Sequence, residues 1–115
     1  MYASRPKIWH RFISNLKKTP GVPITTLELG SGTGLASMLV ASSKAVQQVE
    51  HSHIEMFLTD LPALLDFTHF NVEKNKQSFP NHITMNLHPL RWGNCNDLQS
   101  LPPHARFPDV VFGAD

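Results

Sequence analysis

The sequence has little of several features that mark specialised classes of protein. Its 115 residues include one cysteine, Cys95, so no disulfide can form within the chain, and this favours a reducing compartment. No apolar run approaches the roughly 18 residues that a membrane-spanning helix needs, so we expect no membrane partner. The formal net charge of +1 gives no general argument for a nucleic-acid partner. With 41% apolar and 17% charged residues, the composition is typical of one ordinary folded domain.

The charges are unevenly distributed along the chain. Residues 1–27 hold five basic residues and no acidic one, whereas the remainder has a net charge of 5 − 9 = −4. An acid-free, amphipathic start that contains arginine resembles a mitochondrial presequence, although a first helix with a basic polar face has the same pattern. We expect the cytoplasm as the compartment and keep the mitochondrion as the alternative.

Apolar spacing predicts an alternation of helices and strands. Apolar residues spaced three or four positions apart predict helices near residues 8–16, 35–49 and 62–77. In the second of these helices, Leu35, Met38 and Leu39 belong to one apolar stripe. Short apolar runs predict strands near 24–29 and 110–112, and alternating apolar residues predict strands near 53–60 and 83–90. Residues 92–108, rich in asparagine, proline and glycine, are predicted to form a loop.

Strands separated by helices require crossover connections, so the order predicts an α/β fold with a doubly wound, mainly parallel sheet. The sequence stops at the end of the fourth predicted strand, where such a fold continues with another helix. We therefore expect a single domain over residues 1–115 that is C-terminally incomplete, truncated after its fourth strand, with one unpaired sheet edge.

A glycine-rich segment between the first strand and the second helix is the strongest local signal. Residues 27–34 read LELGSGTG, and glycines in this position let the backbone turn sharply and approach a ligand closely. The dinucleotide pattern G-x-G-x-x-G fails, because its last glycine would fall at Leu35, and no Gly-Lys-Ser/Thr follows to make a phosphate loop. A ligand without a pyrophosphate, such as S-adenosylmethionine, fits better than NAD or ATP.

Asp60 ends the second predicted strand, where an acidic side chain can accept hydrogen bonds from ribose hydroxyls. It lies 26 residues after Gly34, somewhat more than the usual spacing of about 20. The alternative is that Asp60 caps the helix that begins at Pro62.

Four segments in order carry a family resemblance: 27–35 (LELGSGTGL), 58–60 (LTD), 90–93 (LRWG) and 109–115 (DVVFGAD). Together they resemble the methyltransferase-like protein lysine methyltransferases, which have seven β-strands and depend on S-adenosyl-L-methionine. The resemblance implies transfer of a methyl group to a lysine of a protein substrate. It also implies a substrate of chaperone, AAA ATPase or elongation factor type.

The resemblance implies a role for each matching residue. The methionine part of the cofactor would lie against Glu28, Gly30, Ser31, Gly32, Thr33 and Gly34. Asp60 would hold the ribose hydroxyls, Trp92 would pack beside the adenine, and Ala114 would contribute to the pocket wall. Trp9 resembles an upstream tryptophan that also contacts the cofactor. For both tryptophans the alternative is packing in the core, and for Glu28 it is a buried contact at a helix end.

Asp115 matches the first residue of an Asp-x-x-Tyr-like motif that borders the target lysine in the family. It would orient the lysine ammonium and assist the loss of its proton. Because the aromatic residue of the motif is not in this sequence, two other hypotheses stay open. One is an inactive cofactor-binding remnant, and the other is a methyltransferase that acts on a small molecule.

His51, His53 and Cys95 were the remaining candidates for chemistry. Two histidines without a third ligand nearby are typical of a surface loop rather than a metal site. Cys95 lies in a polar segment with no base to activate a thiol nucleophile.

Overall fold

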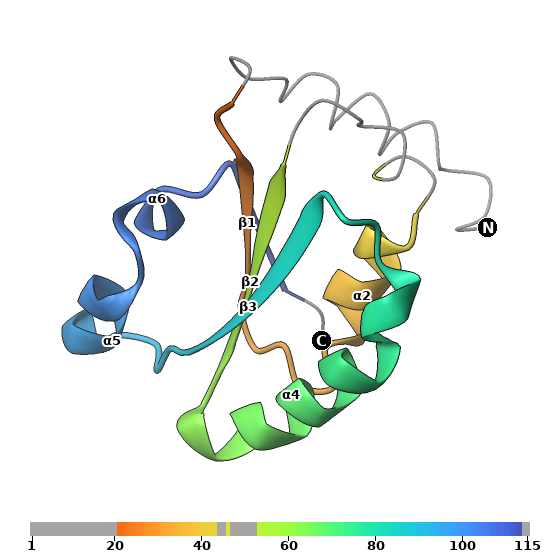
Figure 1. Ribbon diagram of the computed structural model, residues 1–115. Helices are drawn as coiled ribbons and strands as arrows, with labels where there is room; N and C mark the ends of the chain where they lie inside the picture. The colour runs from red at the N-terminus through yellow and green to blue at the C-terminus, as the bar shows by residue number, and fades with distance from the viewer. Residues whose placement is uncertain (1–20, 44–45, 47–52, 114–115) are drawn as a thin grey trace.

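The structure is a computed structural model that describes residues 21–43, 46 and 53–113 (Figure 1). Four strands form one sheet in the order β3-β2-β1-β4, and all three pairings are parallel. The elements in chain order are β1 (Ile24–Glu28), α2 (Leu35–Ala41), β2 (Ile54–Asp60), α4 (Pro62–Asn75), the 3-10 helix η2 (Lys76–Ser78), β3 (Ile83–Pro89), α5 (Cys95–Ser100), α6 (Pro103–Arg106) and β4 (Val110–Phe112). The predicted α/β fold with a parallel sheet is confirmed.

Helices cover both faces of the sheet. On one face, side chains of α2 and α4 such as Ala41 and Val72 pack with Ile54, Met56 and Leu58 of β2. On the other face, Leu101 and Ala105, from the segment of α5 and α6, pack with Leu27 and Phe57. Figure 1 shows these two layers, with α2 and α4 on one side of the strands and α5 and α6 on the other. The sheet is therefore wound in both directions from β1.

The chain reverses its direction of winding between β1 and β4. It runs outward from β1 through β2 to β3, and then α5 and α6 return it to the opposite side of β1, where β4 pairs. In an open parallel sheet, ligands bind outside the carboxyl ends of the strands near such a switch point. The topology alone therefore directs attention to the carboxyl end of β1, where the direction of winding reverses.

The four predicted strands are confirmed, each within one residue at its ends. The loop predicted for residues 92–108 is wrong in part, because it contains α5 and α6. The Asn94 side chain caps α5 by accepting a hydrogen bond from the backbone N–H of Asp97 at 3.0 Å. Pro103 supplies the first turn of α6. Helices of six and four residues are too short for an apolar period to reveal them.

The apolar stripe predicted for the second helix is wrong in part: Met38 and Val46 pack in the core, but two leucines of the stripe do not. Leu35 and Leu39 are 58% and 62% exposed, whereas the buried residues of α2 are Ser37 and Ala41. The reason is a polar contact: the Ser37 hydroxyl donates a 2.6 Å hydrogen bond to the buried carboxylate of Glu28. Satisfying that carboxylate turns the small face of the helix inward.

In the part of the chain that the structure describes, no helix has the length and apolar character needed to cross a membrane. The predicted helix at 8–16 lies outside the described residues, as do Val49 and His51.

Candidate cofactor site

The carboxyl ends of three strands bring the predicted glycine loop, Asp60 and Trp92 to one place. The loop follows β1, Asp60 is the last residue of β2, and Trp92 follows β3. Gly30, Asp60, Leu61, Leu90 and Trp92 line one cavity of about 460 Å³. That volume lies within the range of about 300–1,000 Å³ that is usual for small-molecule sites. Three predicted site residues from separate segments therefore share one cavity.

The glycine loop takes a backbone path that only glycine adopts easily. Gly30, Gly32 and Gly34 have φ angles of +66°, +53° and +82°, all in the left-handed region. Gly30 faces the cavity, where a Cβ atom would lie 3.9 Å from the Trp92 indole. At Gly34 a Cβ atom would lie 3.3 Å from both Leu58 Cδ2 and Thr68 Cγ2. The first glycine thus leaves room for a ligand, and the third lets α4 pack closely.

Neighbouring elements hold the loop through its backbone. The Ser31 N–H donates to the Thr59 carbonyl at 2.8 Å, and the Gly34 N–H donates to the Ser31 carbonyl at 2.7 Å. The Ser31 hydroxyl is buried and has no hydrogen-bond partner among the residues that the structure describes. An unsatisfied buried hydroxyl is costly, so a ligand that bonds to it would relieve that cost.

Asp60 binds one backbone group of the glycine loop and the backbone group of the residue that follows it. Its carboxylate accepts 2.8 Å and 2.7 Å hydrogen bonds from the N–H groups of Gly32 and Leu61. The alternative role as a helix cap is wrong, because the N-cap of α4 is Leu61 and no side chain caps that end. Two carboxylate oxygens offer about four acceptor positions, so Asp60 has capacity left for ligand hydroxyls.

Glu28 lies behind the loop rather than in the cavity. It is only 1% exposed, and its carboxylate accepts the Ser37 hydrogen bond described above. The Thr59 hydroxyl also donates to the Glu28 carbonyl at 2.6 Å. Burial away from water raises the pKa of the Glu28 carboxyl, and the Ser37 hydrogen bonds lower that pKa by a smaller amount. Glu28 therefore makes a buried contact at the start of α2, which is the alternative role that the sequence left open for it.

Trp92 is 76% exposed, so the alternative that it packs in the core is wrong. An ion pair fixes the turn that carries it: the Arg91 guanidinium donates to both carboxylate oxygens of Asp97, at 2.8 Å and 3.0 Å. The Arg91 backbone N–H donates to Asp97 as well, at 2.9 Å. These hydrogen bonds lower the pKa of Asp97 to about 2. On the cavity side, the Leu90 N–H donates to the Asp60 carbonyl at 3.0 Å.

The structure does not describe every predicted site residue. Trp9, Ala114 and Asp115 lie outside the described residues. Sequence reasoning missed Leu61 and Leu90, which line the cavity, although each is within two residues of one that was predicted. It also missed Thr68 and Asn71 of α4, whose side chains donate hydrogen bonds to the Gly32 and Thr33 carbonyls.

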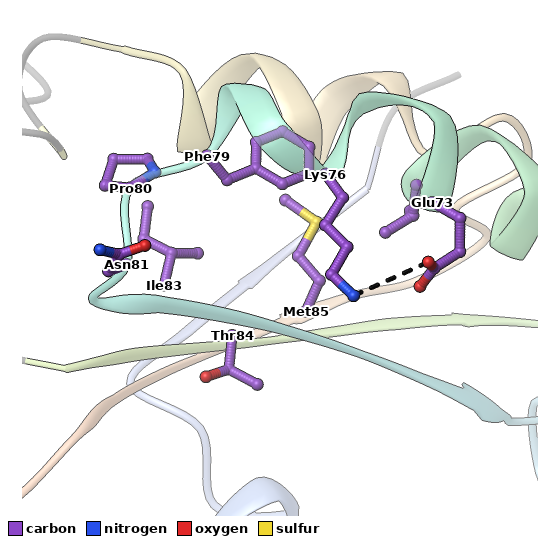
Figure 2. A pocket seen from close by; sticks show the side chains of 9 residues that line it. Glu73, Lys76, Phe79, Pro80, Asn81, Ile83, Thr84 and Met85 are labelled. Atoms are coloured by element: carbon purple, nitrogen blue, oxygen red, sulfur yellow. Dashed lines mark ion pairs between the residues drawn. The ribbon is translucent and has the colours of Figure 1, made fainter.

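A second cavity of about 370 Å³ lies between α4, η2 and the start of β3 (Figure 2). Its lining mixes apolar and polar side chains. Glu73 and Lys76, two of the lining residues, form an ion pair at 3.8 Å, which is the dashed line in Figure 2. It shares no lining residue with the first cavity. Within the described segments, no cluster of three or more histidine, cysteine, aspartate or glutamate residues could hold a metal ion.

The parallel sheet, the glycine loop and the acidic end of β2 define a Rossmann-like α/β protein. Residues 5–115 match the family model described as lysine methyltransferase. The chain belongs to the lysine methyltransferase family.

A relative of the chain is found in fission yeast. A UPF0665 family protein of Schizosaccharomyces pombe is 35% identical over 86 residues, which make up 75% of this chain and 22% of that protein. The chain therefore spans 22% of the length of this curated relative.

Proposed function

We propose that the chain binds S-adenosyl-L-methionine in the cavity beside Asp60 and provides the cofactor site of a protein lysine methyltransferase. Membership of the lysine methyltransferase family supports the class of reaction. The single observation that carries the cofactor assignment is the cavity in which Gly30, Asp60 and Trp92 meet.

The residues present fit the adenosine half of this cofactor. Asp60 supplies a carboxylate for the ribose hydroxyls, and its position is fixed by two backbone hydrogen bonds. Trp92, Leu61 and Leu90 supply the aromatic and aliphatic surface that a purine ring requires. Gly30 leaves the floor of the cavity open to the ligand.

The methionine half of the cofactor would meet the backbone of residues 30–34 and the buried Ser31 hydroxyl. Glu28 would act through this loop, because its carboxylate bonds to Ser37 and does not line the cavity. When bound, the cofactor supplies an electrophilic methyl group on a sulfonium. Asp115 is proposed, from the family motif alone, to orient the lysine ammonium and help it lose a proton.

Isothermal calorimetry with S-adenosylhomocysteine tests the cofactor assignment. We expect saturable one-to-one binding to the chain, and we expect Asp60→Ala to abolish it while the circular dichroism spectrum stays unchanged. Glu73→Ala, in the second cavity, is the matched control and should bind normally. Absence of heat with the unaltered chain, or equal binding by the Asp60→Ala variant, would overturn the proposal.

The lysine specificity needs a separate test with the gene product in a cell extract. Transfer of a labelled methyl group to protein lysine is the expected outcome. A labelled metabolite with no labelled protein would favour the small-molecule alternative instead.

A further inference from the structure

Side chains of α4, which are distant from the glycine loop in the sequence, hold the loop by hydrogen bonds. Thr68 of α4 donates a hydrogen bond from its hydroxyl to the Gly32 carbonyl. One turn further along α4, Asn71 donates from its side-chain amide to the Thr33 carbonyl at 3.1 Å. Because Asp60 binds the Gly32 N–H, Gly32 is tied to the end of β2 through its N–H and to α4 through its carbonyl.

Thr68 is built into this contact. Its side chain is fully buried, with a relative exposure of 0%, and a Cβ atom on Gly34 would lie 3.3 Å from its methyl group. The Leu64 carbonyl lies 3.3 Å from the same hydroxyl, as a backbone acceptor within α4. A threonine buried in a helix could satisfy its hydroxyl within that helix alone. Here the shorter contact goes to the loop.

A loop with three left-handed glycines needs such support. Glycine has the largest conformational freedom of any residue, so fixing its backbone carries the largest loss of conformational entropy. The side chains that could anchor the loop are few, because glycines occupy three of the five positions 30–34. Carbonyl contacts from α4 therefore determine which way the Gly32 and Thr33 peptides face, and so which way the neighbouring N–H groups point.

We propose that Thr68 and Asn71 are positioning residues that hold the glycine loop in the shape that binds the cofactor. The inference rests on the proposed function, because the loop's shape matters only if the cavity binds a ligand. Neither residue lines the cavity, so each acts through the loop backbone. Loss of the Thr68 hydroxyl frees the Gly32 peptide to rotate. Binding of the ligand must then order the loop, which α4 orders in the unaltered chain, and this lowers the affinity.

Two substitutions at Thr68 separate positioning from packing. Thr68→Val keeps the side-chain volume and removes the hydroxyl, whereas Thr68→Ser keeps the hydroxyl and removes the methyl group. We expect Thr68→Val to weaken binding of S-adenosylhomocysteine about tenfold, which is the effect of one lost buried hydrogen bond. Thr68→Ser should bind within about twofold of the unaltered chain, even though the lost methyl group lowers its melting temperature.

Asn71 gives an independent variant with a control on the same helix. Asn71→Ala removes the contact to Thr33 and is expected to weaken binding about threefold to fivefold. Asn75→Ala removes a similar side-chain hydrogen bond, to the Asn71 carbonyl at 2.8 Å, that stays within α4 and should leave affinity unchanged. This pair keeps the proposal open to refutation if Thr68→Val does not fold.

Amide hydrogen exchange provides a second readout that needs no ligand. In the ligand-free chain, Thr68→Val and Asn71→Ala should speed exchange at Gly32 and Gly34, while amides in β3 exchange at the normal rate. The inference is overturned if the unaltered chain binds S-adenosylhomocysteine and both variants bind equally well with unchanged loop exchange. If the unaltered chain does not bind, the proposed function fails first and the inference fails with it.

Discussion

Two segments at the carboxyl edge of the sheet form the walls of the same cavity, yet they are held in opposite ways. The glycine loop at residues 30–34 is fixed by hydrogen bonds to residues that lie 28 or more positions away. It donates to Thr59 and Asp60 and accepts from Thr68 and Asn71. By contrast, the turn that carries Trp92 is fixed locally, by an ion pair between Arg91 and Asp97, six residues apart. The first wall depends on the whole fold, whereas the second depends on two charges.

This difference predicts how the walls fail. Damage to the glycine loop strains the backbone and disturbs the packing of α4, so it affects stability and binding together. Damage to the Trp92 turn removes one ion pair at the surface, in which the Arg91 side chain is 54% exposed, so we expect a small loss of binding and almost no loss of stability. The predictions below test this contrast, beginning with the largest expected effect.

Gly34→Ala should have the largest effect. The substitution forces a side chain into the left-handed region at φ +82° and against Leu58 and Thr68. Backbone strain of this kind costs about 1–3 kcal/mol. We expect a clear loss of melting temperature and no detectable binding of S-adenosylhomocysteine.

Gly30→Ala is the matched control, because a Cβ atom there meets only the Trp92 indole, at 3.9 Å. It should destabilise the chain less than Gly34→Ala, although its φ of +66° still adds strain. Equal stability of Gly34→Ala and the unaltered chain would contradict the close packing described for α4.

Asp60→Asn should come next. An asparagine oxygen can still accept the Gly32 N–H, so the loop keeps its tether. The lost negative charge weakens hydrogen bonds from ribose hydroxyls, and we expect affinity for S-adenosylhomocysteine to fall about tenfold to a hundredfold. Calorimetry measures the change, with melting temperature as the check on the fold. An affinity within twofold of the unaltered chain would argue against the ribose role.

Asp97→Asn should have a smaller effect, confined to the second wall. We expect the affinity for S-adenosylhomocysteine to weaken by about threefold, because the turn that carries Trp92 loses the ion pair between Arg91 and Asp97 that orients it. The fluorescence of Trp92 reports the change in its surroundings directly when it is measured in a Trp9→Phe background, where Trp92 is the only tryptophan in the sequence.

The same ion pair predicts a pH dependence for the Trp92 turn. The pKa of Asp97 is lowered to about 2, so the stabilisation is present above the ordinary value of 3.8. It is lost as the pH falls from 3.8 through about 2. In an acid titration, the fluorescence of Trp92 should change within that pH window. Below the window Asp97 is protonated, so the unaltered chain and the Asp97→Asn variant should give the same signal; above it their signals should differ. A change centred above pH 5 would show that another group controls the turn.

Glu28→Gln should have the smallest effect on ligand binding, and it should raise the stability of the chain rather than lower it. Because burial raises the pKa of Glu28 above its ordinary 4.5, the fold disfavours the ionised form, and stability falls as the pH rises from 4.5 through the raised pKa. The glutamine is neutral and can still accept the Ser37 hydrogen bond. We expect its melting temperature to be a few degrees higher at pH 7, with the gain disappearing below pH 4.5. A lower melting temperature of Glu28→Gln at pH 7 would contradict the view that burial disfavours the ionised Glu28 carboxylate.

The parts of this fold that sequence could predict were those with local signals. The strands were predictable because each is a short apolar or alternating run, and because glycine or proline lies within two residues of both ends of β1 and of β4. The glycine loop and Asp60 follow known patterns at the ends of β1 and β2. Their meeting in one cavity follows from the parallel order of the strands. The family prediction is confirmed by the match over residues 5–115.

The parts that could not be predicted depend on contacts between distant residues. Thr68 and Asn71 meet the loop across 36 and 38 residues of chain, so no window of sequence contains both partners. The inward turn of Ser37, which left Leu35 and Leu39 exposed, follows from the need of Glu28 for a donor. The compartment and the type of substrate stay predictions from the sequence.

Two-dimensional amide NMR of the chain, titrated with S-adenosylhomocysteine, tests the central claim most directly. We predict shifts that saturate and that cluster at residues 30–34, Asp60, Leu61 and Trp92, including the Trp92 indole N–H. Amides around the second cavity, such as those of Lys76 and Thr84, should not move. Shifts confined to that second cavity, or a spectrum that does not respond at millimolar ligand, would contradict the account.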